Sequence, residues 1–292
     1  MEITFLGTSA ATSCPLMFCR CKVCEQARKL GGPDFRKRSS LLINKDLLID
    51  LGPDIMSASF MHGVSIADIR YCLQTHSHSD HFDASHLSTR IPEYASENVP
   101  FLELYASNAT LKKMSEMLKA DGYIDNILDP KEQKLLSMTV FPVKALQTFN
   151  IGKYQVTAFP TNHDRSVDSL LYAITEDNFS IFYGTDTDIL PEETWKGFHN
   201  KKIKFDIVIL DLTYGPDIEG GGHLNANQFI EHIQRMKDEN LLKKNARIFA
   251  THISHEGNSI HSEMVEYGKK YGYEIAYDGL IVWLKGFSYE QN

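Results

Sequence analysis

The chain has 292 residues, with 30 Lys and Arg residues against 38 Asp and Glu residues and a hydrophobic fraction of 42%. This length allows a core that folds without disulfide bonds, and the hydrophobic fraction excludes disordered and collagen-like classes. A net charge of −8 argues against a general nucleic-acid binder and against binding to an anionic membrane. No run approaches the roughly 18 apolar residues of a membrane span. The N-terminus has no basic lead of a secretion signal, so we expect a cytoplasmic protein without a membrane partner.

The first part of the chain predicts short strands separated by polar turns. Strands are expected at 3–5, 40–43, 47–49, 69–74 and 102–105, and the second and third of these form a hairpin. A helix is expected over 108–120, with Asn108 as its N-cap.

The rest of the chain predicts consecutive strands, followed by alternating strands and helices. Strands are expected at 139–143, 154–159, 170–174, 180–183, 205–210 and 247–250, helices at 225–237 and 259–271, and a closing hairpin at 274–277 and 280–283. Pro142 places the first of these strands at a sheet edge. The order predicts two mixed α/β sheets covered by helices in a single domain over 1–292, with a local insertion around 85–136.

Three histidines and one aspartate lie within six residues, directly after the strand over 69–74: His76, His78, Asp80 and His81. In an extended chain His76 and His78 point to the same side, so both imidazoles can reach one metal ion. Asp80 and His81 follow after the chain has turned and can face a second ion. Imidazole and carboxylate suit zinc, iron or manganese better than calcium. The pattern therefore predicts a metal site rather than a His-rich surface loop.

A site for two ions needs further ligands, and three later strands each end just before a suitable side chain. These side chains are His163, Asp186 and His252. Residues in loops that follow strands commonly converge on one functional site. We therefore expect these three residues to complete the site.

Three cysteines lie close together as Cys19, Cys21 and Cys24. A tight cluster within an odd total of five cysteines fits a metal site better than a disulfide framework. Free thiols in a loop are the alternative. Cys14 and Cys72 are interpreted as ordinary residues, with Cys72 in the core of a strand.

The H-x-H-x-D-H motif and the later His, Asp and His resemble the metallo-β-lactamase-fold hydrolases over nearly the whole chain. The resemblance implies a four-layer αββα sandwich and two divalent ions, zinc or manganese, in the active site. Asp50 matches the aspartate of the family's strand-Asp-x-Gly turn. The implied ligands are His76, His78 and His163 for one ion, Asp80, His81 and His252 for the other, and Asp186 as the bridge.

Within this superfamily the chain resembles the PhnP-type phosphodiesterases of the carbon–phosphorus lyase pathway, which carry a C-x-C-x-x-C run and a later T-H-x-x-H element. The resemblance implies that Cys19, Cys21, Cys24 and His255 hold one structural zinc ion in a closed tetrahedral site. Such enzymes also have a histidine between the Asp ligand and the T-H-x-x-H element. His223 stands there, and we assign it as the general acid. The alternative is a histidine that precedes and caps the helix over 225–237.

These features predict a metal-dependent phosphodiesterase that hydrolyses a small, including a cyclic, phosphodiester, with His223 and Asp80 as catalytic residues. Three alternatives stay open: a tRNA 3′-processing nuclease, a thioester or lactone hydrolase, and a non-catalytic metal-binding accessory protein. The acidic chain lacks the basic surface or arm that an RNA substrate needs. The complete ligand set argues against the accessory protein. The assembly is left open between a monomer and a homodimer.

The remaining histidines and one basic run receive ordinary interpretations. The histidines at 62, 86, 199, 232 and 261 are expected in loops or on the surface, with His232 facing solvent from its helix. The run over 36–38 is expected as a solvated turn that could help to attract a phosphorylated substrate.

Overall fold

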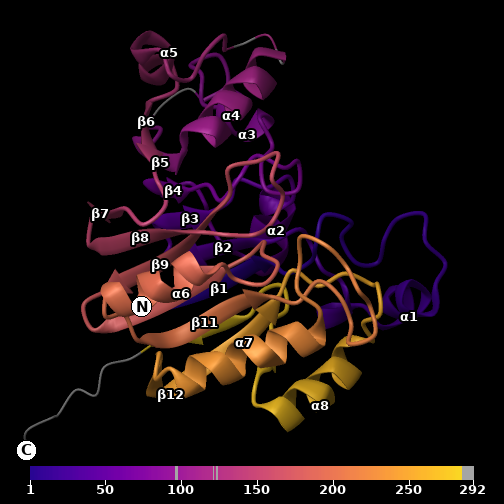
Figure 1. The fold of residues 1–292 in the computed structure, drawn as a ribbon. Helices are drawn as coiled ribbons and strands as arrows, with labels where there is room; N and C mark the ends of the chain where they lie inside the picture. The colour runs from indigo at the N-terminus through magenta and orange to yellow at the C-terminus, as the bar shows by residue number, and fades with distance from the viewer. Residues whose placement is uncertain (96–97, 121, 123, 285–292) are drawn as a thin grey trace, which may run out of the picture.

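Two sheets of seven strands each form the centre of the computed structural model, which describes residues 1–95, 98–120, 122 and 124–284 (Figure 1). The first sheet has the order β14-β1-β2-β3-β4-β5-β6, and the second has the order β13-β12-β11-β10-β9-β8-β7. The strands of the first sheet are β1 (Glu2–Gly7), β2 (Ser40–Ile43), β3 (Leu47–Ile49), β4 (Tyr71–Leu73), β5 (Leu102–Ser107), β6 (Met138–Val143) and β14 (Ile281–Trp283). Those of the second are β7 (Thr148–Ile151), β8 (Tyr154–Pro160), β9 (Leu170–Glu176), β10 (Phe179–Gly184), β11 (Phe205–Asp211), β12 (Leu242–Thr251) and β13 (Glu274–Ile275).

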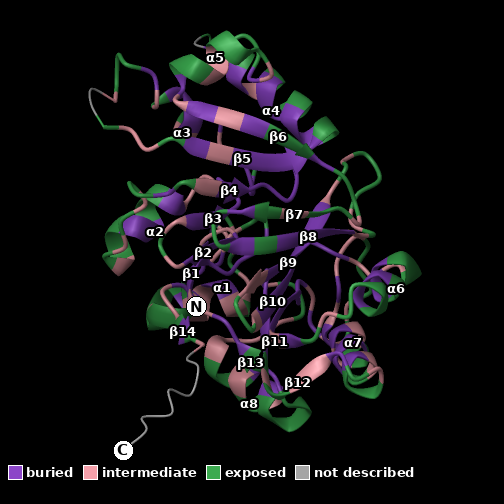
Figure 2. Cartoon of the chain, turned by 90° about the vertical axis from the view of Figure 1, so that its left-hand side faces the viewer, coloured by how far each residue is buried: buried purple, intermediate pink, exposed green. Residues whose placement is uncertain are grey.

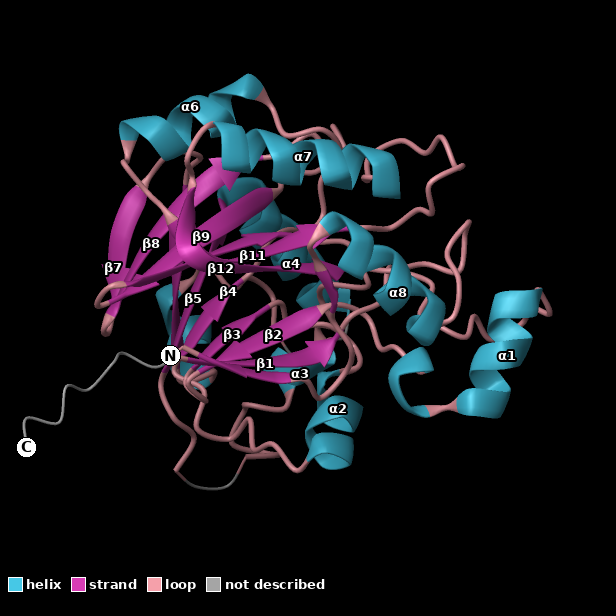
Figure 3. Cartoon of the chain, turned by 90° about the horizontal axis from the view of Figure 1, so that it is seen from below, coloured by secondary structure: helices cyan, strands magenta, loops and turns pink. Residues whose placement is uncertain are grey.

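Helices cover the outer faces of both sheets, as Figure 3 shows for α6 and α7 on one side and α2 and α3 on the other. The helices are α1 (Lys22–Leu30), α2 (Ile55–His62), α3 (Ser85–Ser88), α4 (Asn108–Ala120), α5 (Pro130–Leu135), α6 (Glu192–Asn200), α7 (Ala226–Asp238) and α8 (His261–Tyr271), with a short 3₁₀ turn η1 (Gly32–Asp34). α1 lies apart from both helical layers, at the side of the molecule (Figure 1). Within the described residues, none of the helices combines the length and apolar character needed to cross a bilayer.

Three apolar cores explain this layering. The central core joins the facing surfaces of the two sheets, and it includes Leu41 of the first sheet and Tyr172 and Ile207 of the second, all buried. A second core lies between the first sheet and its helices, where Leu111 and Met114 of α4 are fully buried. The third lies between the second sheet and α6, α7 and α8. Since both faces of each sheet are covered, inner strands such as β2, β10 and β11 are buried along most of their length, whereas the edge strands β7 and β14 are partly exposed (Figure 2).

The sheets bring the ends of several strands to one edge. β10, β11 and β12 run parallel to one another in the second sheet, and β3, β4 and β5 run parallel in the first. Parallel strands end at the same edge of a sheet, and the loops beyond that edge are where ligands bind in such sheets. The expected ligands follow β4, β8, β10 and β12, so the topology gathers them before any side chain is considered.

Two local expectations are corrected at the end of the chain and at α4. The closing hairpin over 274–277 and 280–283 is wrong: β13 pairs with β12 and β14 pairs with β1, in different sheets. Asp278 carries the chain across, because its carboxylate accepts hydrogen bonds from Thr8 Oγ1 at 2.8 Å and from the Lys37 N–H at 2.7 Å. The cap of α4 is Ser107, whose Oγ accepts from the Thr110 N–H, and the helix already includes Asn108.

The segment around 85–136 contributes directly to the first sheet. Its strand β5 lies between β4 and β6, and α4 contacts both β5 and β6. β6 ends the described sheet, where Pro142 needs no partner on its outer side, as expected for an edge strand.

His232 and the basic run over 36–38 are also placed differently from the expectation. His232 is buried in α7, where its Nδ1 donates to the Gln228 carbonyl and its Nε2 accepts from the Leu190 N–H. Arg36 is buried and donates to Thr8 Oγ1, while Arg38 makes a two-pronged pair with Asp54. These arginines hold the fold together rather than presenting free charge to a ligand.

Candidate metal centre

Three histidine nitrogens converge at the first group of expected ligands. His76 Nε2 lies 3.0 Å from His78 Nδ1, and His163 Nε2 lies 3.2 Å from the same atom. His76 and His78 come from the loop after β4 in the first sheet, whereas His163 follows β8 in the second. The group therefore forms only when the two sheets have packed together.

The second group contains two carboxylates and two imidazoles, all buried: Asp80, His81, Asp186 and His252. Asp80 Oδ2 lies 3.2 Å from His81 Nε2, and Asp186 Oδ1 lies 3.0 Å from His252 Nε2. Burial by itself raises the pKa of the Asp80 carboxyl, but the neighbouring His81 and the contact with His252 hold that pKa well below its usual range.

Asp186 lies between the two groups. Its Oδ2 is 3.6 Å from both His76 Nε2 and His163 Nε2 of the first group, and 3.2 Å from His81 Nε2 of the second. A single carboxylate that faces both groups is the arrangement that a ligand shared by two ions requires. The structure thus brings together all seven side chains that the sequence singled out for the dinuclear site.

The state of the histidine nitrogens shows that these residues fit a cation. A carboxylate or carbonyl oxygen only accepts hydrogen bonds, so a histidine nitrogen beside one carries the proton and leaves its other nitrogen with a lone pair. His81 Nδ1 donates to Asp50, and His163 Nδ1 donates to the Gly222 carbonyl. In both rings the Nε2 that remains faces the other ligands.

In His76 and His252 a threonine hydroxyl, rather than a carboxylate or carbonyl, accepts the Nδ1 proton. Thr75 Oγ1 donates to Asp50, so it accepts from His76 Nδ1 at 3.0 Å. Thr213 Oγ1 donates to Asp211, so it accepts from His252 Nδ1 at 2.8 Å. The lone pairs of Nε2 again point into the site.

The atoms at the centre lie close to one another without forming hydrogen bonds among the described residues. His81 Nε2, His252 Nε2 and Asp186 Oδ1 are all buried without a hydrogen bond among the described residues. Buried polar atoms normally have partners, and leaving three of them together without one is costly. Lone pairs and carboxylate oxygens that face one another in this way are the donor set of a bound divalent cation.

Asp50 supports the second group from behind. This fully buried carboxylate accepts from His81 Nδ1 and the Thr75 N–H, each at 2.7 Å, and from Gln74 Nε2 at 3.0 Å. Burial raises the pKa of Asp50, although His81 beside it acts in the opposite direction. Asp50 lies in the left-handed region with φ of 66°, which is uncommon for a residue other than glycine and is held here by these hydrogen bonds.

His223 lies beside both groups, held by a buried carboxylate. Its Nδ1 donates to Asp211 Oδ2 at 2.8 Å, and its ring centroid is 4.7 Å from that of His163 and 4.9 Å from that of His252. Burial lowers the pKa of His223, but the charge and hydrogen bond of Asp211 outweigh burial and raise it above its ordinary value. The structure places His223 beside the candidate metal ligands, and its role as the general acid stays a prediction.

The cysteine group forms a second, separate cluster of candidate metal ligands: Cys19, Cys21, Cys24 and His255. His255 Nδ1 lies 3.5 Å from Cys21 Sγ and 3.9 Å from Cys19 Sγ. Burial raises the pKa of the Cys21 thiol, but hydrogen bonds from the Cys24 N–H and the neighbouring side chains lower it to about 7. A thiol that ionises near neutral pH is suited to binding a metal ion. Cys72 is buried in β4, as expected.

Comparison with known proteins identifies the family. Residues 45–253 match the model of the beta-lactamase superfamily domain, a span that holds all seven residues predicted for the dinuclear site. This chain belongs to the beta-lactamase superfamily. The sequence resemblance is thereby confirmed.

Several solved structures share the fold of this chain. A diphosphatase of the PhnP family matches with a TM-score of 0.71 and 21% identity, covering 97% of this chain and 98% of that chain. Zinc-bound PqqB from Methylobacterium extorquens gives a TM-score of 0.69 at 18% identity, covering 97% and 100%. The short form of human tRNase Z gives 0.66 at 16% identity, covering 98% and 100%. The predicted αββα sandwich is confirmed.

One curated relative matches a smaller part of the chain. An octanoyltransferase from Porphyromonas gingivalis (strain ATCC BAA-308 / W83) is 36% identical over 85 residues, which are 28% of this chain and 16% of that protein. The matched segment thus spans about a sixth of the length of this curated relative.

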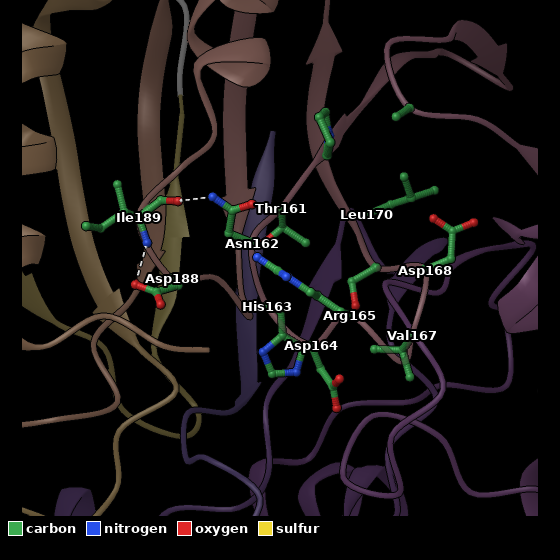
Figure 4. Close-up of a pocket in the computed structure, with 13 residues that line it drawn as sticks. Thr161, Asn162, His163, Asp164, Arg165, Val167, Asp168, Leu170, Asp188 and Ile189 are labelled. Carbon is green, nitrogen blue, oxygen red and sulfur yellow. Dashed lines mark hydrogen bonds between the residues drawn. The ribbon is translucent and has the colours of Figure 1, made fainter. Parts of the chain in front are cut away.

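A cavity of about 540 Å³ lies beside His163 in this chain (Figure 4). Figure 4 shows Arg165 reaching across it toward Thr161 and Asn162, with Asp164 next to His163. Asp164 Oδ2 is also 3.4 Å from His78 Nε2, on the side of the ring away from the other ligands. The cavity gives a substrate room beside the first group of ligands.

Sequence reasoning missed four residues that support the ligands: Gln74, Asp164, Asp211 and Thr213. Each is a single polar residue next to a strand or ligand, without a repeated spacing that would distinguish it. Asp211 gave one usable signal, because it is an acidic residue at the end of an apolar strand, as Asp50 is. The Thr251-His252 pair gave no indication that Thr213, which follows β11, forms a hydrogen bond with the His252 ring.

Proposed function

We propose that this member of the beta-lactamase superfamily is a metal-dependent phosphodiesterase that hydrolyses small phosphodiesters. The observation that carries the proposal is the position of His223 beside both ligand groups, with its second nitrogen fixed by Asp211. A phosphodiester needs negative charge neutralised at its phosphoryl oxygens and a proton supplied to its departing oxygen. The centre offers residues for both tasks.

The ligand sets divide as the resemblance implies. His76, His78 and His163 would hold one divalent ion, Asp80, His81 and His252 the other, and Asp186 would contact both. When bound, two such ions supply an activated water at neutral pH and stabilise charge on the substrate oxygens.

The chain's own residues complete the reaction. His223 donates a proton to the departing oxygen from Nε2, while Asp211 holds Nδ1 and stabilises the protonated ring. Asp211 also accepts from Thr213 Oγ1, which holds His252, so one buried carboxylate orients both the acid and a ligand. Asp50 plays the corresponding part for His81 and His76, through its own contact and through Thr75.

Hydrolysis of model substrates tests the proposal. The full chain, loaded in turn with Zn²⁺, Mn²⁺ and Ni²⁺, would be assayed on bis(p-nitrophenyl) phosphate, a p-nitrophenyl phosphate monoester, a lactone and a precursor tRNA. We expect the diester to exceed the monoester, which brings an additional negative charge into the site. Fast cleavage of the precursor tRNA at its 3′ end, with little action on small diesters, would favour the nuclease instead.

A second candidate is hydrolysis of an acyl ester or thioester. It rests on the partial match to an octanoyltransferase, an enzyme named for an acyl group. The same centre can direct water at a carbonyl carbon, since the developing charge is again on an oxygen. An octanoyl thioester, assayed beside bis(p-nitrophenyl) phosphate at equal concentration, separates the two. Turnover of the thioester with no detectable diesterase activity would replace the first proposal by the second.

A further inference from the structure

A second cavity lies away from the metal centre, between α7, α8 and the loops at 216–217 and 257–259. Its volume is about 280 Å³, near the lower end of the roughly 300–1,000 Å³ of small-molecule sites. Leu212, Met264 and Ile275 give it an apolar wall, and all three are buried. The dimensions fit a small ligand with an aliphatic part.

The charged groups of this cavity are acidic. Asp217 and Glu263 line it, and no Lys, Arg or His is among the described residues that do so. Neither carboxylate forms an ion pair with another described residue, although Glu263 lies in the first turn of α8, where the helix dipole favours it. Each candidate metal site in the described chain has at least three His, Cys, Asp or Glu side chains, and neither Asp217 nor Glu263 belongs to one. The two carboxylates therefore do not indicate a metal site.

Tyr273 gives an independent indication of a ligand. The residue is 4% exposed and lines the cavity, yet its hydroxyl has no hydrogen bond to any described residue. A buried tyrosine hydroxyl usually has a partner. The hydroxyl is also absent from the fully enclosed atoms without partners, so it keeps some exposed surface on a residue that lines the cavity. Tyr267 adds a second ring to the wall, and tyrosine rings attract cations through their faces.

We propose that this cavity binds the alkylammonium group of a small aliphatic amine. Asp217 and Glu263 supply the opposite charge, the tyrosines supply ring faces and a hydroxyl acceptor, and the apolar wall receives the carbon chain. An anion is disfavoured by the two carboxylates, and a neutral alkyl group leaves the Tyr273 hydroxyl without a partner.

One residue of the cavity wall forms hydrogen bonds with residues that lie next to the candidate metal ligand His252. Asn258 lines the cavity and donates from Nδ2 to the carbonyls of Thr213 and Ser254, at 2.9 and 3.0 Å. Thr213 holds His252, and Ser254 lies between His252 and His255. Asp217 belongs to the same loop as His223. An amine that contacts Asp217 and Glu263 would therefore join the His223 loop to α8.

Calorimetric binding to the full, metal-loaded chain tests the proposal without using turnover. The probes are 1,4-diaminobutane, n-butylamine, n-butanol and a blocked lysine (Nα-acetyl-lysine methylamide). We expect the amines to bind at least tenfold more tightly than butanol, and less tightly as salt rises. Tighter binding of the diamine assigns a free amine, whereas tighter binding of the blocked lysine assigns a partner's side chain. Equal binding of butanol and butylamine, or binding of neither, overturns the proposal.

Substitutions of the lining residues test whether the amine binds in this cavity. The double variant Asp217→Asn, Glu263→Gln should weaken amine binding by about tenfold, since it removes two partly solvated charges. Tyr273→Phe should weaken it several-fold by removing one hydrogen bond. Glu266→Gln is the matched control, because Glu266 lies on α8, is paired with Lys269 and does not line the cavity. A loss in the control equal to that in the double variant would show a general charge effect and overturn the assignment.

Discussion

The two candidate metal sites, dinuclear and cysteine, share one segment of the chain at His252 and His255, yet they differ in ligand type, burial and completeness. The dinuclear group combines imidazoles with carboxylates, shares Asp186 between two sets and is mostly buried. The cysteine group has three thiols and one imidazole, is half-buried, and has the four ligands of a closed tetrahedral site. His252 and His255 are only three residues apart, yet one belongs to a group suited to catalysis and the other to a group suited to stabilising the fold.

Their supports differ as well. Imidazoles of the dinuclear group are oriented by partners behind them, and the ligands follow four strands drawn from both sheets. The cysteine group is local: Cys21 begins α1 by accepting from the Cys24 N–H, and only His255 comes from a distant part of the chain. We therefore expect loss of a dinuclear ligand to remove activity, and loss of a thiol to remove stability.

The largest expected effect is on turnover, from Asp80→Ala. The change removes a predicted ligand and takes away the Asp80 oxygen that lies 3.2 Å from His81 Nε2 and 3.7 Å from His252 Nε2. Diesterase activity should fall to the background of the assay while the circular dichroism spectrum stays native. Asp125→Ala, which removes an exposed carboxylate paired with Lys119, is the control and should retain both. Substantial diesterase activity in Asp80→Ala would contradict the dinuclear assignment.

The next effect is on zinc content and stability, from Cys21→Ser. Loss of one thiolate ligand should lower bound zinc by about one equivalent and lower the unfolding temperature, because metal binding at a structural site contributes to folding. The measurements are metal analysis by mass spectrometry and thermal unfolding. Cys14→Ser is the matched control, since Cys14 lies in the same segment but outside the cluster. Unchanged zinc in Cys21→Ser would refute the structural site.

His223→Ala separates the acid from the ligands. A p-nitrophenolate leaves without a proton, whereas an alkoxide needs one, so the cost of the change depends on the leaving group. We expect a loss of roughly 10² on an alkyl diester and a much smaller loss on bis(p-nitrophenyl) phosphate, with metal content unchanged. Equal losses on both substrates, or loss of metal, would make His223 a ligand or a structural residue.

Much of this organisation could be predicted because it rests on local patterns. The hairpin of β2 and β3 follows from a polar turn between two apolar runs, and the length of α4 follows from helical periodicity; the structure matches both residue by residue. The ligands were found because His and Asp cluster after strands. The αββα layering came from the family resemblance and agrees with the strand and helix order.

The rest depends on contacts between distant residues. The separation of β13 from β14 is set by Asp278 with Thr8 and Lys37, which lie more than 240 residues away. Buried His232 accepts a hydrogen bond from the Leu190 N–H, and no sequence pattern near the helix predicts this distant partner. The short helices α1, α2 and α6 escaped prediction because each spans only two turns or so and depends on packing for its stability.

Asp211→Asn tests the support that sequence reasoning missed. The change keeps the shape of the side chain but weakens its hold on His223 and on Thr213. Changing a supporting partner of this kind typically costs about 10–100-fold in activity or metal affinity. The double variant with His223→Ala should be little worse than His223→Ala alone on an alkyl diester, because the two residues act together. Fully additive losses would show that Asp211 acts independently of His223.

The smallest expected effect concerns Arg38 and Asp54, a surface pair beyond the turn that contains Asp50. Burial raises the pKa of Asp54, but hydrogen bonds from Arg38 outweigh it and lower that pKa below the ordinary 3.8. A lowered folded-state pKa means that the ionised carboxylate stabilises the fold at pH above 3.8, and that this contribution is lost as the pH falls through the folded-state value. Since both side chains are partly exposed, solvent limits the contribution at pH 7 to about 1 kcal/mol or less.

Asp54→Asn should therefore be slightly less stable than the parent in urea at pH 7, with the difference shrinking as both are acidified below pH 3.8. Bound metal should be unaffected at pH 7, because neither residue contacts a ligand among the described residues. This outcome would show that the turn around Asp50 is held by its buried hydrogen bonds with Thr75, Gln74 and His81 rather than by the surface pair. A loss of metal in Asp54→Asn would instead mean that the dinuclear group, like the cysteine group, depends on contacts near the surface.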